Sequence, residues 1–547
     1  MQRSTALLFL GLWSSACDVT VVDGSVPSKP FPVANIDTGG YGQGGNPTQG
    51  GAGGGQIGGG GGGPIGGGGG GQGACDGGGP VVETAGANDK FLLKGMLLLP
   101  AGPLEGELLI VGDSIACAAL SCAGDPDAAG ATVIDTNGVI APGLLDAHNH
   151  IIYDIFNEDD WAPTQVYTNH NQWPNDERYG AMGDAKRYLN GEGSPIDLGC
   201  EMDKYSETKG LIAGTTSIQA SPGGNVRPCY QSVSRTIDTT HNDLPTPDTM
   251  QTSVGFPQAS AANGVCANFL DGDTTSYVIH IAEGTDQNAA DEFDDLFAVT
   301  TPDGCLFEPK TTIIHGVALS DAQIDTFGAA GMHLVWSPQS NVFLYGSNTD
   351  MSKTANIPKF IEAGINIAIA PDWSLGGSQN MLDEMRYADQ VDNAQWGDIL
   401  GSADIVRMAT INAAEALGVA SLLGSLEVGK RADVAVFLPS DSGGDAYDAI
   451  LEATPREVTL VFLDGRLLYG DADMSGSVAD NSISEDIDIC CRQKFLAIAE
   501  TGGNPNDNLD QLFSEMAEVL ESALSDYDAQ DLTEWDFAPI APVVKCP

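Results

Sequence analysis

Basic residues are scarce in this chain. Its 547 residues include 23 Lys and Arg against 75 Asp and Glu, which gives a formal net charge of −52 at pH 7. A protein this acidic repels nucleic acids and anionic membrane surfaces over a Debye length, so we expect no phosphate-bearing polymer as a partner. We interpret the charge mainly as a source of solubility outside the cell, and an attraction for cationic substrates is the alternative.

Long apolar runs are scarce as well. No segment after the N-terminus has the roughly 18 consecutive apolar residues that a membrane-spanning helix needs. Residues 1–16 are typical of an export signal, with Arg3, an apolar core at residues 6–13 and small residues before a cleavage site. Cys17 follows at once, and residues 14–17 resemble a bacterial lipobox in which Ser14 replaces the usual Leu. We therefore predict export to the bacterial cell envelope and a lipid anchor at Cys17; cleavage next to an unmodified Cys17 is the alternative.

Glycine, by contrast, is abundant near the N-terminus. Residues 39–79 are mostly glycine with Gln, Asn and Pro, a composition that cannot bury enough apolar surface to fold. We predict that residues 17–80 form a disordered tether, whose glycine-rich part spans roughly 35 Å as a flexible coil.

Cysteine usage fits an exported protein. The chain has 11 Cys. If Cys17 carries lipid, ten remain, which predicts up to five disulfides in an oxidising compartment. None has the spacing of a zinc site, and the candidates for local links are Cys117 with Cys122 and the C-terminal group Cys490, Cys491 and Cys546.

Strand-like runs flank a long central region. They lie at residues 91–99, 106–111, 131–135, 433–437 and 458–469, each bounded by turn residues. We predict a small β-sandwich domain built from both flanks, residues 81–140 and 421–470. After it, residues 471–547 form a C-terminal extension, in which the apolar spacing of residues 507–524 predicts a helix.

The central region, residues 141–420, alternates strand-like and helical runs. The strand-like runs lie at residues 214–219, 276–281, 311–315, 333–336 and 366–370. This alternation predicts an α/β fold with a parallel sheet, and the length suits a (β/α)8 TIM-like barrel.

Histidines stand at the ends of these runs. An apolar stretch from residue 142 ends in His148-Asn149-His150, and alternate strand residues face the same way, so both imidazoles can bind one metal ion. His280, His315 and Asp372 also close or follow strand-like runs, at intervals of about one and two β/α units. Barrel active sites lie at the C-terminal ends of the strands, so we place His150, His280, His315 and Asp372 after strands 1, 5, 6 and 8 of one site.

Several ordered motifs support this site. They lie at residues 142–150, 213–217, 280–284, 314–316, 337–341, 371–374, 409–418 and 424–434. In these motifs the chain resembles the amidohydrolase superfamily over roughly residues 90–470, in particular its cytosine deaminase, guanine deaminase and chlorohydrolase-like branch.

The resemblance implies a metal-dependent mechanism. It implies that one divalent metal, Zn²⁺ first with Fe²⁺ or Mn²⁺ as alternatives, is bound by His148, His150, His280 and Asp372. The metal would activate water, and Glu283 would carry a proton to the substrate nitrogen. His315 would orient the water or stabilise charge, and Asp372 would share in proton transfer.

Binuclear relatives carry a bridging carboxylated Lys. The candidates here are Lys186, Lys204 and Lys209, but each lies in a polar, helix-like stretch. The resemblance therefore favours a single metal.

Candidate substrate contacts follow the first strand and the seventh. Trp161, His170 and Trp173 lie in a loop where family members place residues over the substrate, and packing of the loop on the barrel rim is the alternative. Ser340 and Asn341 are further candidates, with capping of a turn as the alternative. The loop departs from deaminases of known substrate, so we assign no nucleobase.

The resulting hypothesis is an exported hydrolase of a non-peptide C–N bond. We expect a small-molecule substrate, deaminated at an amidine-like or heterocyclic carbon. A cyclic amidase, a C–Cl hydrolase and an acyl-amino-acid amidase are the enzymatic alternatives, and a surface binding protein on an inactive barrel is the non-enzymatic one. The sequence leaves open whether the chain forms a homo-oligomer.

Overall fold

The computed structural model describes residues 78–192, 194–220, 229, 233–240, 242–245, 249–439, 443–503 and 508–546. The predicted export signal, Cys17 and nearly all of the predicted tether lie outside these residues. Within them, no helix combines the length and the apolar character that crossing a bilayer requires.

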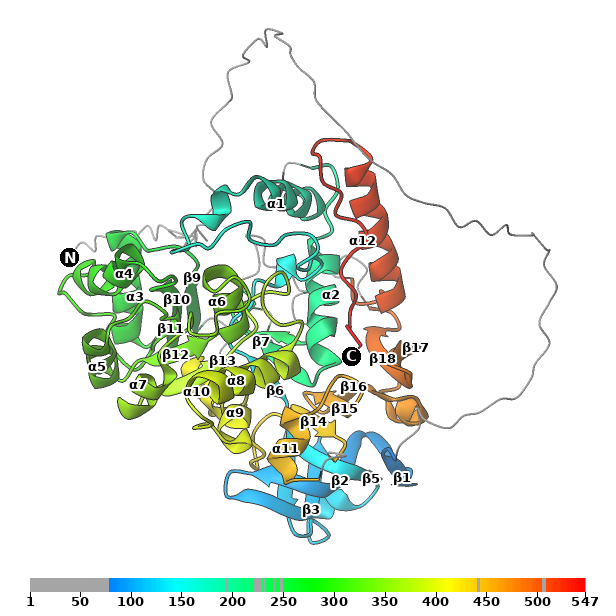
Figure 1. Cartoon of the computed structure of the whole chain (residues 1–547). Coiled ribbons are helices and arrows are strands. Elements are labelled where there is room, and N and C mark those ends of the chain that lie inside the picture. Colours follow the sequence, from blue (N-terminus) through cyan, green and yellow to red (C-terminus); the bar gives the residue numbers. More distant parts are fainter. Residues whose placement is uncertain are drawn as a thin grey trace, which may run out of the picture. The chain divides into compact units, whose positions relative to one another are not determined.

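The central region forms a parallel barrel of eight strands in two sheets (Figure 1). The first sheet contains β6 (Leu144–Asp146), β7 (Thr215–Ile218) and β8 (Arg235–Thr236). The second contains β9 (Met250–Ser253), β10 (Ser276–Ile281), β11 (Thr311–His315), β12 (His333–Trp336) and β13 (Asn366–Ile369). A parallel bridge between Asn149 and Asp372 joins the ends of the first and eighth strands. The predicted α/β barrel is confirmed, and the predicted strand order 1, 5, 6 and 8 holds for its site residues.

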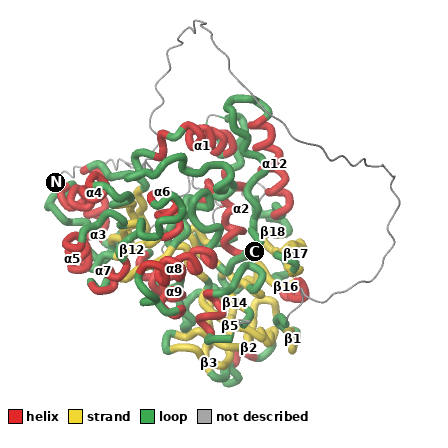
Figure 2. The backbone as a smooth tube through the Cα atoms, in the orientation of Figure 1, coloured by secondary structure: helices red, strands yellow, loops and turns green. Residues whose placement is uncertain are grey.

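Burial explains why these short segments are strands. Every residue of β10 and β11 is buried, as expected for a parallel sheet that helices cover. Helices cover the strands from outside (Figure 2), including α3 (Ala259–Asp271), α4 (Gln287–Ala298), α5 (Asp321–Ala330) and α8 (Met381–Gln395). In a barrel of this kind the site lies at the C-terminal ends of the strands.

The two flanks meet in one mixed sheet of ten strands, consistent with the predicted β-sandwich domain. β5 (Ala131–Pro142) and β14 (Val434–Phe437) pair directly, with Pro142 opposite Val434. The remaining strands are β1 (Val81–Thr84), β2 (Ala87–Leu99), β3 (Gly102–Val111), β4 (Ser114–Ala119), β15 (Val458–Leu463), β16 (Arg466–Asp471), β17 (Ser482–Ile489) and β18 (Arg492–Glu500). The domain boundaries themselves stay a prediction.

The C-terminal extension contributes more than the helix that its sequence predicts. The helix is present as α12 (Phe513–Asp528), which packs on α2 (Gly199–Leu211) and α1 (Glu177–Leu189). The extension also supplies β17 and β18 at one edge of the ten-stranded sheet, which the sequence did not predict.

Four disulfides link the described residues. They are Cys117–Cys122, Cys200–Cys229, Cys266–Cys305 and Cys490–Cys546. The first and last confirm the predicted local links. Cys491 is exposed and free, while Cys17 and Cys75 lie outside the described residues.

Candidate metal centre

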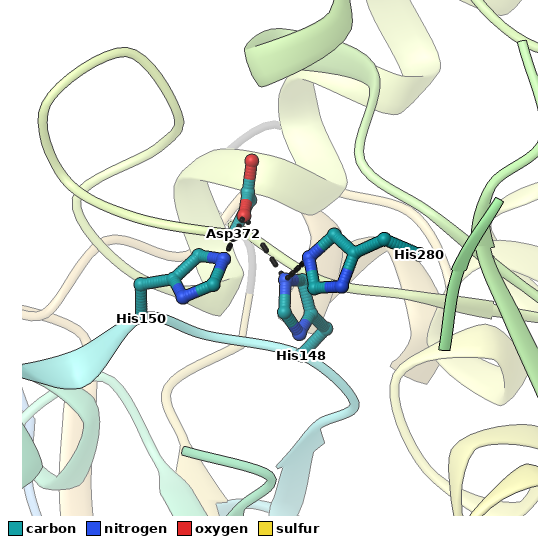
Figure 3. Close-up of side chains that lie close together, drawn as sticks. All are labelled: His148, His150, His280 and Asp372. Carbon is teal, nitrogen blue, oxygen red and sulfur yellow. Dashed lines mark hydrogen bonds and ion pairs between the residues drawn. The ribbon is translucent and has the colours of Figure 1, made fainter. Parts of the chain in front are cut away.

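Four predicted ligands converge at the C-terminal end of the barrel (Figure 3). His148 and His150 follow β6, His280 belongs to β10, and Asp372 follows β13. One ligand atom from each lies within 4.8 Å of all the others. The Nε2 atom of His148 is 3.1 Å from His280 Nε2 and 3.1 Å from Asp372 Oδ1, and His150 Nε2 is 3.6 Å from the same oxygen.

The outer nitrogens of two histidines are bonded to the protein. His148 Nδ1 lies 3.0 Å from Gln219 Oε1, and His280 Nδ1 lies 3.4 Å from the Ser253 carbonyl oxygen. When each Nδ1–H donates outward, the lone pair of each Nε2 faces the centre, as in metal-binding histidines. Three imidazoles and one carboxylate suit Zn²⁺ and also other divalent transition metals.

The protonation of the four groups suits cation binding. Burial and the neighbouring His148 lower the pKa of His150 to about 4, and the same causes lower the pKa of His280 well below its usual range. Burial opposes ionisation of Asp372, but the hydrogen bond with His148 and the charges of nearby histidines outweigh it and lower the pKa of this carboxyl. At His148, the contact with Asp372 outweighs burial and raises the pKa. Metal binding requires an unprotonated Nε2 on His148, so it competes with protonation of this ring.

Two site residues adopt a left-handed backbone. The φ angle is 72° at His315 and 74° at Asp372, a region that residues other than glycine seldom occupy. Such conformations persist where the surrounding structure enforces them, and they gather at functional sites. Here they change the direction of the chain at the end of β11 and after β13, next to the four ligands.

Glu283 and His315 lie beside this cluster. His315 Nε2 is 3.8 Å from Glu283 Oε2, and the ring centroids of His315 and His280 are 5.3 Å apart. The Tyr345 hydroxyl donates to Glu283 Oε1 at 2.8 Å. The structure thus brings together all six predicted metal and catalytic residues.

Ser340 and Asn341 contact these residues. The Ser340 hydroxyl donates to Asp372 Oδ2 at 2.6 Å, and Asn341 Oδ1 lies 3.1 Å from His315 Nδ1. Both contacts favour a role in orienting Asp372 and His315 over direct contact with substrate.

The three predicted substrate contacts in the loop after β6 have different surroundings. Trp161 is fully buried and its indole N–H donates to Asp176, which does not favour a contact with substrate. His170 lies against Glu283, with its Nδ1 3.3 Å from Oε2. The ring of Trp173 lies 5.3 Å from that of Trp373, whose ring is 6.2 Å from His150. Trp173 therefore approaches the metal centre through its contact with Trp373.

Trp373, Tyr345 and Gln219 are site residues that sequence reasoning missed. Trp373 directly follows Asp372, is 3% exposed, and its buried indole N–H has no hydrogen-bond acceptor. Gln219 ends a predicted strand-like run, so the rule that places barrel sites at strand ends could have identified it. No sequence signal identifies Tyr345, which ends the helix α6 (Pro338–Tyr345).

The lysines of a two-metal site are engaged elsewhere. The ammonium of Lys186 pairs with Glu192, that of Lys204 donates to the Asn508 carbonyl, and that of Lys209 donates to the Asp154 carbonyl. Within the described residues, the cluster of His148, His150, His280 and Asp372 is the one group arranged to hold a metal. This arrangement favours a single cation.

Comparisons with known proteins find similarity to amidohydrolases and deaminases. A model of the amidohydrolase family matches residues 270–468. A 5'-deoxyadenosine deaminase from Methanothermobacter thermautotrophicus is 24% identical over 419 residues, which cover 71% of this chain and 95% of that protein. A 5-methylthioadenosine/S-adenosylhomocysteine deaminase from Desulforudis audaxviator is 31% identical over 171 residues, 30% of this chain and 38% of the relative.

A similar fold occurs in a zinc-bound adenosine deaminase from Xanthomonas campestris. The structures superpose with a TM-score of 0.54 at 17% identity, covering 71% of this chain and 94% of that one. At this identity the likeness establishes the barrel fold.

Proposed function

Because the chain belongs to the amidohydrolase family, we propose that it is a metal-dependent hydrolase that deaminates a small amidine-like or heterocyclic amine. The observation that carries the proposal is the convergence of three histidines and Asp372 next to Glu283. The names of the similar deaminases support deamination, and the substrate of this chain is not taken from them.

A divalent cation bound by the four ligands would lower the pKa of water from about 15.7 toward 7. Burial opposes ionisation of Glu283, but the charge of His315 and the hydrogen bond with His170 outweigh it and lower the pKa of this carboxyl. Glu283 is therefore a carboxylate at neutral pH, ready to accept a proton.

Proton transfer by Glu283 accounts for both halves of the reaction. Its carboxylate takes a proton from the attacking water as the new C–O bond forms. Its carboxylic acid then gives that proton to the amino nitrogen, the C–N bond breaks, and ammonia leaves. The Nε2 atom of His315 lies 3.8 Å from Glu283 Oε2 and would stabilise the charge that develops on the substrate.

Other leaving groups could use the same residues. Opening of a cyclic amide and hydrolysis of an acyl-amino-acid amide also break a C–N bond, while hydrolysis of a C–Cl bond releases chloride. We favour deamination because similar proteins are named as deaminases and because Glu283 follows His280 by three residues at the end of β10. The intact ligand set with Glu283 disfavours a binding protein on an inactive barrel. Export is part of the same proposal and is supported by the N-terminal sequence.

The proposal is tested by metal analysis and a substrate screen. We expect the purified protein to hold about one transition metal ion per chain and to release ammonia from at least one amine or amidine. Asp372→Asn, the matched control, should lose the metal and the activity together. Absence of metal, together with a melting temperature that chelators do not change, would refute the proposal. Ring opening without ammonia would favour a cyclic amidase.

A further inference from the structure

A main-chain clamp fixes the loop between β6 and α1 to the end of β10. Asn169 forms an antiparallel bridge with Gly284, the His170 N–H donates to the Glu283 carbonyl at 3.1 Å, and the Thr285 N–H donates to the Thr168 carbonyl at 2.7 Å. A Cβ atom on Gly284 would lie 2.5 Å from the Thr168 carbonyl oxygen, so only glycine allows this approach. The clamp sets His170 beside Glu283.

The His170 side chain bridges two carboxylates. Its Nδ1 is 3.3 Å from Glu283 Oε2, and its Nε2 is 2.7 Å from Glu292 Oε1 on α4. A neutral imidazole has one N–H, so only the doubly protonated ring donates to both carboxylates. The second oxygen of Glu292 accepts from the Ala282 N–H at 2.9 Å, which fixes Glu292 in turn.

The surroundings of His170 favour this cation. The charged groups that face its ring come from two elements: Glu283 after β10 and Glu292 on α4. Burial opposes protonation of the ring, but the hydrogen bonds to these two carboxylates outweigh it and raise the pKa of His170 to about 10.

We propose that His170 is a positioning residue, which as a cation between Glu283 and Glu292 holds the Glu283 carboxylate in its orientation toward the metal centre. Both oxygens of Glu283 are then fixed, Oε1 by Tyr345 and Oε2 by His170. This inference rests on the proposed role of Glu283 as proton carrier. Misplacement of a reacting group by about 1 Å can cost roughly 100-fold in rate. We therefore expect the loss of His170 to lower kcat rather than to raise KM.

The kinetic test compares His170→Gln with a histidine at the opposite end of the strands. His333 begins β12 and contacts the Pro309 carbonyl, so His333→Gln is the matched control. We expect His170→Gln to lower kcat about 10- to 100-fold with KM within about twofold, while metal content and melting temperature stay at the parent values. Glu292→Gln, which keeps a hydrogen-bond acceptor, should lower kcat by less. An unchanged kcat in His170→Gln, or a loss confined to KM, would overturn the inference.

A spectroscopic test needs no substrate. In protein labelled with ¹⁵N at its seven histidines, the signals absent from His170→Gln should belong to a ring with both nitrogens protonated at pH 8. In Glu292→Gln the same ring should lose its proton at a lower pH than in the parent protein. A neutral His170 ring in the parent at pH 8 would overturn the inference even in an active enzyme. Absence of ammonia release from every compound would instead count against the proposed function.

Discussion

Gln219 connects the metal centre to the rest of the barrel through one ligand. Its Oε1 accepts from His148 Nδ1 at 3.0 Å, and its Nε2 donates to Asp238 Oδ2 at 2.9 Å. These two bonds fix which nitrogen of His148 carries the proton and how its ring is turned. Partners of this kind control metal affinity without touching the metal.

Gln219→Ala should therefore weaken metal binding without abolishing it. We expect the affinity for Zn²⁺ to fall about 10- to 100-fold, because His148 loses the acceptor that orients it. Titration against a competing chelator measures the change. Gln493→Ala, at an exposed position of β18, serves as the control and should bind Zn²⁺ like the parent. Equal affinities in the two variants would show that Gln219 does not orient the ligand.

At the scale of residues, the sequence predicts the metal ligands better than it predicts the residues that hold catalytic side chains in place. His148, His150, His280 and Asp372 occupy strand ends, and the spacing of strands can be read along the chain. Tyr345 and Glu292 reach the site through contacts between distant segments, which no local pattern records. The left-handed backbone at His315 and Asp372 likewise arises from the fold around them.

At the scale of elements, one buried arginine joins the barrel to the ten-stranded sheet. Arg235 of β8 is 1% exposed. Its guanidinium pairs with Asp433, directly before β14, and lies 2.7 Å from an oxygen of Asp464 in the turn between β15 and β16. Arg235 is thus the buried partner of the buried Asp433 and of the partly buried Asp464, and Arg431 lies 3.5 Å from the other oxygen of Asp464.

Arg235→Met should destabilise the protein strongly. We expect the free energy of unfolding, from urea denaturation, to fall by about 3–5 kcal/mol, because both carboxylates lose their buried partner. Adding Asp433→Asn and Asp464→Asn to this variant should restore part of the loss. Arg466→Met removes a partly exposed pair with Glu500 and should cost only about 0–1 kcal/mol. Equal losses in the two arginine variants would contradict the argument.

Most strands with an apolar run were predicted, with β18 as an exception, and the strands without such a run were not. β8 has only two residues, and β9 is a partly exposed Met-Gln-Thr-Ser segment, so neither produced a signal. β17 lies at the edge of its sheet and alternates isoleucine with acidic residues, most of them outside the core. Charged side chains are a common protection of edge strands, and they mask the strand in the sequence.

At the scale of the molecule, the C-terminal extension braces the loop that carries His170. The Ala541 N–H donates to the Ile155 carbonyl at 2.7 Å, and the Tyr205 hydroxyl donates to the Ala541 carbonyl at 2.6 Å. The Cys490–Cys546 disulfide ties the end of this segment to the turn between β17 and β18. Family motifs end before this region, so its sequence alone did not indicate that it supports the site.

The net charge of −52 limits the ways in which the whole protein can bind a membrane. Anionic lipids repel such a surface, so electrostatic attraction cannot hold the protein there. We propose that acyl chains on Cys17 do so, because each buried CH₂ contributes about 0.8 kcal/mol and this term does not depend on salt.

Cell fractionation tests the anchor directly. The parent should sediment with membranes at both low and high salt, since burial of acyl chains is not screened. Cys17→Ser should move to the soluble fraction. Cys491→Ser removes an exposed free thiol and should stay with the membranes, which separates acylation from any general effect of losing a cysteine. Equal partitioning of Cys17→Ser and the parent would refute lipidation.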